Sequence, residues 1–184
     1  MVKPLTLAVT IFILAMMGAA KADQNDAKLD ALFARLQETV GVGEAATIEQ
    51  SIWAIWLRSD NAAVDKRMSV GIKAMNKGAL KISLLAFDEI TKMAPTFAEG
   101  WNKRATTYFL LGQYEASVRD IQQTLLLEPR HFGALSGMGL IYAAIGKDKA
   151  ALKVWEKALS INPQMPGIRA RIEDLRQKLK GAPA

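Results

Sequence analysis

Residues 101–112 read WNKRATTYFLLG and residues 135–146 read LSGMGLIYAAIG, and the two segments share one pattern. Both hold a small residue, a tyrosine and a glycine at matching positions, namely Ala105, Tyr108 and Gly112, then Gly139, Tyr142 and Gly146. The same interval of 34 residues separates Pro95, Pro129 and Pro163. A fixed interval of this length is typical of a helical repeat, which buries its apolar face by stacking on its neighbours.

Glycine and proline divide each repeat into two helices. Gly78, Gly112 and Gly146 each precede a proline by 17 residues, and glycine closes a helix because it adopts the left-handed conformation without a Cβ penalty. Proline closes the second helix, because it lacks an amide donor and disfavours helix in the residue before it. These marks predict repeats at residues 64–97, 98–131 and 132–165.

Small and large side chains recur with the same period. Gly71 in the first helix is matched by Ala105 and Gly139, and Phe87 in the second helix is matched by Ile121 and Trp155. Two helices approach closely only where side chains are small, so these residues are interpreted as packing residues.

The pattern resembles the tetratricopeptide repeat family. The residues that carry the resemblance are Gly71, Gly78, Phe87, Pro95, Trp101, Ala105, Tyr108, Gly112, Pro129, Gly139, Tyr142, Gly146, Trp155, Ala158 and Pro163. The resemblance implies an all-α, right-handed solenoid of three helix-turn-helix repeats. The first repeat departs most from the family pattern, with Arg67 and Ala74 where aromatic residues are favoured.

The flanking segments are expected to complete the solenoid. Residues 23–63 show two apolar stripes at helical spacing, separated by Gly41 and Gly43, and predict a degenerate helical pair or cap covering the first repeat. Residues 166–184 carry one apolar stripe, from Ile168 to Leu179, as in a capping helix with a polar outer face.

Residues 1–22 have the composition of a secretory signal peptide. Lys3 precedes an apolar run from Leu5 to Met17, and Ala20 and Ala22 flank a cleavage point before Asp23. An uncleaved membrane anchor is the alternative, although the run is short for a spanning helix. We expect a bacterial protein that is periplasmic or secreted, with no stable membrane span after cleavage.

The charge of the chain argues against nucleic acid as a partner. Without Lys3 and Lys21 the formal net charge falls from +6 to about +4. The basic residues are scattered among acids rather than gathered in the stripe that nucleic-acid binding needs.

The resemblance implies that the first helices line a concave groove. The candidate partner-binding residues there are Met68, Ile72, Met75, Asn102, Thr106, Phe109 and Leu140. Such a groove suits an amphipathic helix or an apolar extended peptide. The alternative is that the end helices fold across the groove and bury these side chains. The positions with which one branch of the family grips the terminal carboxylate of heat-shock chaperones hold Met68, Ile72, Gly133 and Gly137 here, which argues against such a clamp.

No residue pattern indicates catalysis, a metal or a cofactor. His131 is the single histidine, the chain has no cysteine, and His131 is expected on the rim of the third repeat. The sequence therefore predicts a non-catalytic scaffold or assembly factor of the bacterial envelope that binds another protein. Self-association through the Trp53 and Trp56 cap or the last helix is the alternative, followed by an enzyme of unrecognised type that depends on His131.

Overall fold

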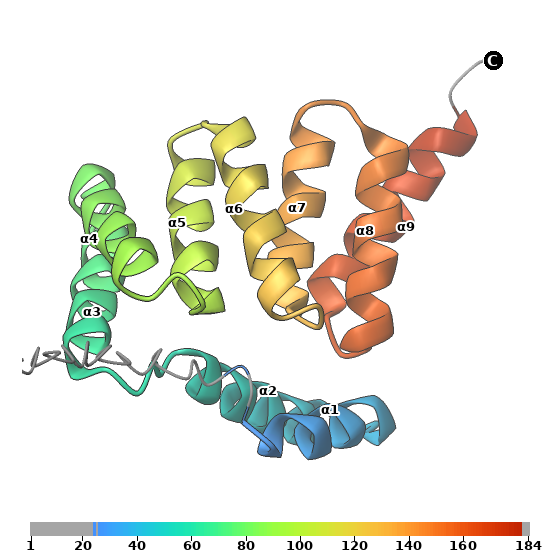
Figure 1. The fold of residues 1–184 in the computed structure, drawn as a ribbon. Helices are drawn as coiled ribbons and strands as arrows, with labels where there is room; N and C mark the ends of the chain where they lie inside the picture. Colours follow the sequence, from blue (N-terminus) through green and yellow to red (C-terminus); the bar gives the residue numbers. More distant parts are fainter. Residues whose placement is uncertain (1–23, 25, 182–184) are drawn as a thin grey trace, which may run out of the picture.

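The computed structural model describes residues 24 and 26–181, and the elements in these residues are helical (Figure 1). The described residues form nine α-helices: α1 Lys28–Glu38, α2 Val42–Trp56, α3 Ala62–Asn76, α4 Leu80–Met93, α5 Ala98–Leu110, α6 Tyr114–Leu127, α7 Phe132–Ala144, α8 Asp148–Ile161 and α9 Pro166–Gly181. The all-α prediction is confirmed. The expected signal peptide, residues 1–22, lies outside the described residues.

Helices α3 to α8 form three pairs that stand side by side in a row (Figure 1). The turn inside each pair contains a glycine with positive φ, and these angles are 72° at Gly78, 73° at Gly112 and 74° at Gly146. In the first turn the amide of Ala79 donates to the carbonyl of Ala74 at 2.9 Å, so the left-handed glycine lets the chain satisfy the end of α3. The three glycines therefore form the same tight turn between the two helices of each repeat.

Each pair packs a glycine or alanine of its first helix against a large side chain of its second. A Cβ atom added to Gly71 would lie 2.5 Å from Cε1 of the buried Phe87 ring. A Cβ atom added to Gly139 would clash with the indole of Trp155, which is also buried. The recurring small residues are thus needed for the close approach of the two helices.

Helix α9 covers the last repeat. Ile168, Ile172 and Leu175 are buried in one cluster with Ala151 and Trp155 of α8. The opposite face of α9 is exposed and charged, as a solubilising end of a repeat array requires.

Helices α1 and α2 form a hairpin, called here the N-terminal hairpin, which crosses the row along the edge made by the turns between repeats (Figure 1). Arg130 in the turn after α6 contacts Asp30 of α1 at 2.6 Å. Asn162 in the turn after α8 donates to Glu49 of α2 at 2.7 Å. The sequence predicted that the hairpin would cover the first repeat. In the structure the apolar face of the hairpin instead packs on Phe132 of α7.

None of the helices in the described part of the chain combines the length and the hydropathy needed to cross a membrane.

Candidate functional site

A hollow of about 290 Å³ lies between α5 and α7, the first helices of the second and third repeats. Four of the seven predicted groove residues line it, namely Asn102, Thr106, Phe109 and Leu140. Its floor consists of core residues that include Ala105, Ile121 and Ala134. We call this hollow the groove pocket; it is an apolar recess on the surface formed by the first helices.

The three predicted groove residues of the first repeat lie elsewhere. Met68 is buried in a core cluster with Val64 and Phe87, so its prediction as an exposed groove residue is wrong. Its flexible side chain fills the interior of the first repeat. Ile72 and Met75 are half-buried against the same cluster and do not line the groove pocket.

The N-terminal hairpin closes one end of the groove. A Cβ atom added to Gly133, a lining residue of the groove pocket, would lie 2.7 Å from Cη2 of Trp53. The ammonium of Lys103 on α5 lies 5.1 Å from the centre of a Trp53 ring. Thr106 and Leu140 remain half-exposed further along. The alternative that an end helix covers the groove is therefore correct for the part next to Trp53, whereas the part around Thr106 and Leu140 is open.

A buried polar network stands behind the covered end. Oε2 of Glu99 lies 2.8 Å from Nε2 of His131 and accepts a hydrogen bond from Nδ2 of Asn102 at 2.9 Å. Oε1 forms an ion pair with Nζ of Lys103 at 2.9 Å but has no hydrogen-bond partner among the described residues. Glu99 and His131 are both fully buried. A charged side chain tolerates such burial only when it is paired and hydrogen-bonded.

His131 is fixed in one tautomer by its neighbours. Its Nδ1 accepts a hydrogen bond from the backbone amide of Ala134 at 3.0 Å, so the neutral ring carries its proton on Nε2 and donates it to Glu99. The same contact caps the start of α7. The prediction that His131 lies on the rim is wrong, because α2 covers the ring on its other side.

The pKa of Glu99 reflects a balance of opposing effects. Burial raises it, but the charge of Lys103 and the hydrogen bond from His131 outweigh burial and hold the pKa below its ordinary value. Glu99 is therefore a structural carboxylate that stays ionised near neutral pH.

The network has no signature in the sequence, because Glu99 and its partner His131 are far apart along the chain. Glu99 and His131 are 32 residues apart. The one local sign was the pairing of Trp53 and Trp56 on a single helix, since such large rings need a surface to cover.

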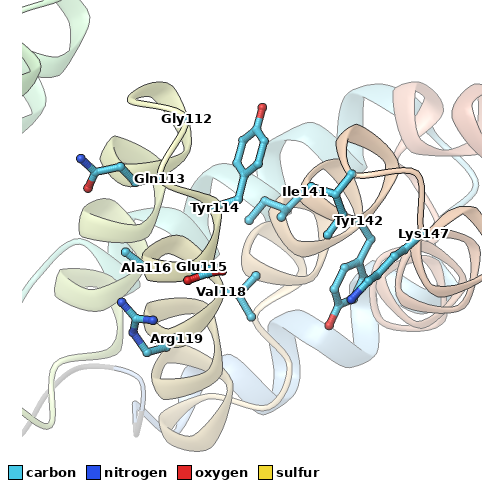
Figure 2. A pocket seen from close by; sticks show the side chains of 11 residues that line it. Gly112, Gln113, Tyr114, Glu115, Ala116, Val118, Arg119, Ile141, Tyr142 and Lys147 are labelled. Carbon is cyan, nitrogen blue, oxygen red and sulfur yellow. The ribbon is translucent and has the colours of Figure 1, made fainter.

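A second and larger hollow, of about 810 Å³, lies between α6 and α7 (Figure 2). Tyr114, Val118 and Tyr142 are among its walls, and Arg119 and Lys147 add two cations. It opens beside the turns inside the repeats, at the edge opposite the N-terminal hairpin. This outer hollow is the rival of the groove pocket as a binding site.

Within the described residues, no group of three or more His, Cys, Asp or Glu side chains is placed to hold a metal ion.

The repeat architecture is shared with known proteins. The tetratricopeptide repeat (TPR) profile matches residues 98–131 and 133–165. A TPR repeat-containing protein of Rhizobium etli is 35% identical over 178 residues, which span 97% of this chain and 86% of that protein. The chain belongs to the tetratricopeptide repeat family. The TPR profile leaves out residues 64–97, the repeat that departs most from the family pattern.

Solved TPR domains share the fold. The Sgt2 TPR domain from Aspergillus fumigatus superimposes with a TM-score of 0.62 at 21% identity, covering 67% of this chain and 87% of that domain. The first TPR of Spaghetti (RPAP3), bound to an HSP90 peptide, gives a TM-score of 0.58 at 21% identity and covers 60% and 88%. The chain is thus a TPR protein whose structural relatives include a peptide-binding domain.

Proposed function

We propose that this protein is a non-catalytic protein-binding module that takes an apolar peptide or helix segment into the groove pocket. The observation that carries the proposal is the partly exposed cluster of Phe109, Leu110 and Leu140 around a recess on the first helices of two repeats. The volume of the groove pocket, about 290 Å³, is just below the roughly 300–1,000 Å³ of small-molecule sites, so the pocket suits one or two side chains of a longer ligand.

The walls of the groove pocket define the chemistry of the ligand. Its lining residues include no lysine or arginine, so a terminal carboxylate finds no charged partner there. Thr106 and Ser136 supply hydroxyl groups at the margin, which suit the backbone of a bound segment. We therefore infer recognition of internal apolar side chains rather than of a chain terminus.

We place this function in the bacterial envelope. The composition of residues 1–22 supports export by a signal peptide. Mass spectrometry of the chain recovered from fractionated cells tests this: a periplasmic species beginning at Asp23 supports it. An intact N-terminus in the membrane fraction identifies an anchor instead.

Peptide selection against the purified chain tests the groove directly. Peptides recovered from a random library are measured by fluorescence anisotropy against wild type, Phe109→Asp and Ile145→Asp. Ile145 is the matched control, because it is an exposed apolar residue in the outer hollow.

We expect Phe109→Asp to weaken binding at least tenfold while Ile145→Asp leaves it unchanged, with circular dichroism showing equal helicity. The opposite pattern would assign binding to the outer hollow. Equal affinities in all three proteins would reject both sites.

We do not favour the alternative of self-association through the Trp53 and Trp56 cap or the last helix, because the apolar side chains that it would use are covered. Trp56 is buried, and Trp53 is half-buried against α7. The apolar stripe of α9 is turned inward. A different face of the chain, at the first repeat, gathers the exposed apolar side chains of Val70, Ile82 and Leu85.

A further inference from the structure

The outward face of the first repeat is apolar and open. Ala63, Lys66, Arg67 and Val70 of α3 and Ile82, Leu85, Ala86 and Glu89 of α4 line a hollow of about 410 Å³, and we call this set the first-repeat end face. Val70 is 47% exposed, Ile82 57% and Leu85 67%. Clustered exposure of large apolar side chains marks an interaction surface more often than isolated exposure does.

In the second repeat, the face that corresponds to the first-repeat end face packs against a helix of the preceding repeat. Gly100 and Arg104 of α5 occupy the positions of Lys66 and Val70 in the next repeat, and both face α4. A Cβ atom added to Gly100 would lie 2.6 Å from Cγ2 of Ile90. Arg104 donates to Asp88 of α4 at 2.9 Å. The equivalent face of the first repeat is therefore shaped for packed helices.

Nothing in the described part of the chain takes that place. The N-terminal hairpin, which could have stacked there, is instead held along the turns between repeats by contacts such as Asp30 with Arg130. The linker residue Leu57 reaches the core of the first repeat without lining the end face.

The far end of the molecule does not match this face. The exposed side of α9 carries Arg169, Arg171, Glu173 and Asp174. Head-to-tail stacking would set these four charges against the apolar side chains of Val70, Ile82 and Leu85, which is costly for each charge that does not reach Lys66, Arg67 or Glu89. A two-fold arrangement instead sets apolar side chains against apolar side chains.

We propose that two copies of this chain pair through the first-repeat end face around a two-fold axis, so that α3 and α4 of each copy cover those of the other. The face carries both signs of charge, in Lys66, Arg67 and Glu89, so a two-fold arrangement can set opposite charges against each other. Arg67 and Glu89 pair at 2.9 Å with about half of each side chain exposed, so either can reach an opposite charge on the second copy.

The dimer leaves the groove pocket free. The groove pocket lies on α5 and α7, away from the end face on α3 and α4. A dimer therefore presents two grooves, and a partner with two binding segments gains avidity from it. The pairing does not depend on the proposed peptide binding.

Light scattering of the full chain, purified from the cell fraction in which it accumulates, tests the pairing. Leu85→Glu is compared with Leu126→Glu, because Leu126 of α6 is 74% exposed and lies outside the end face. We expect wild type and Leu126→Glu to be dimers and Leu85→Glu to be a monomer of unchanged helicity. A monomeric wild type, or equal loss in both variants, overturns the proposal.

Cysteine crosslinking tests the two-fold arrangement. The chain has no cysteine, so a single introduced thiol reports on one position. Val70→Cys, Ile82→Cys and Leu85→Cys are oxidised separately, with Leu126→Cys as control. A disulfide needs Cβ atoms about 3.5–4.5 Å apart, so we expect a covalent dimer from at least one end-face position and none from the control. Failure at all three, or crosslinking of Leu85→Cys with Arg171→Cys alone, overturns the two-fold pairing.

Discussion

His131 lies flat on Trp56, with ring centroids 4.1 Å apart and an angle of 11° between the planes. The same histidine donates to Glu99 of α5 and caps α7. One buried ring therefore joins the N-terminal hairpin to the first helices of two repeats. This contact holds the N-terminal hairpin over one end of the groove.

Removal of the Trp56 side chain should destabilise the fold. Trp56→Ala leaves a cavity beside His131 and Phe132, and we expect the free energy of unfolding to fall by about 3–5 kcal/mol. Urea denaturation followed by circular dichroism measures it. Val40→Ala is the control, because Val40 is 93% exposed and should change stability by less than about 0.5 kcal/mol.

Replacement of Trp56 by phenylalanine separates packing from hydrogen bonding. The buried Nε1 of Trp56 has no hydrogen-bond partner among the described residues. Trp56→Phe removes this unsatisfied donor while it keeps a ring against His131, so we expect a smaller loss than for Trp56→Ala. An equal loss in both variants would show that ring stacking contributes little.

The stability of the fold should fall in acid through Glu99. Its pKa is held below the ordinary value of 4.5, so the folded state binds this proton more weakly than the unfolded chain does. The stabilisation is present above pH 4.5 and is lost as the pH falls through the folded pKa. Denaturation midpoints measured from pH 7 down to acid should show this decline.

Glu99→Gln provides the test of that assignment. The amide cannot titrate, so we expect lower stability at neutral pH and a flatter decline in acid than in wild type. Glu173→Gln, on the exposed face of α9, is the matched control and should follow the wild-type profile. A Glu99→Gln profile parallel to wild type would place the acid sensitivity elsewhere.

The sequence was sufficient for the repeats because their determinants are local. The turn at Gly112 and the contact of Gly139 with Trp155 each lie within one helical pair, so spacing alone revealed them. The position of the N-terminal hairpin depends on pairs such as Asp30 and Arg130, which are 100 residues apart. No periodicity encodes such a contact, so the sequence did not reveal that Trp53 covers one end of the groove. Met68 was misplaced for a local reason, because its side chain turns into the core of the first repeat.

The close approach of α7 and α8 should be sensitive to a single methyl group. Gly139→Ala places a Cβ atom against the buried indole of Trp155, and we expect a loss of about 1–3 kcal/mol from overpacking. Gly167→Ala, where a Cβ atom meets nothing within 4 Å, should be neutral or stabilise by up to about 1 kcal/mol. Thermal denaturation of both variants measures the difference. Equal midpoints would mean that the pair has room to separate.

Arg104 joins three helices and should matter far more than a surface ion pair. Its Nε and Nη2 donate to Asp120 of α6 at 2.7 and 2.9 Å, and its Nη1 donates to Asp88 of α4 at 2.9 Å. Arg104→Met leaves the buried carboxylate of Asp120 unpaired, so we expect a loss of about 3–5 kcal/mol.

A matched surface pair and a double variant show whether the cost comes from the stranded charge. Arg176→Met breaks the exposed pair with Glu156 and should cost no more than about 1 kcal/mol. Arg104→Met combined with Asp120→Leu removes both buried charges and should recover much of the loss, because the penalty is chiefly that of an uncompensated carboxylate. Additive losses in the double variant would instead mean that the Arg104 side chain stabilises the repeats through packing on Trp101 and Tyr108.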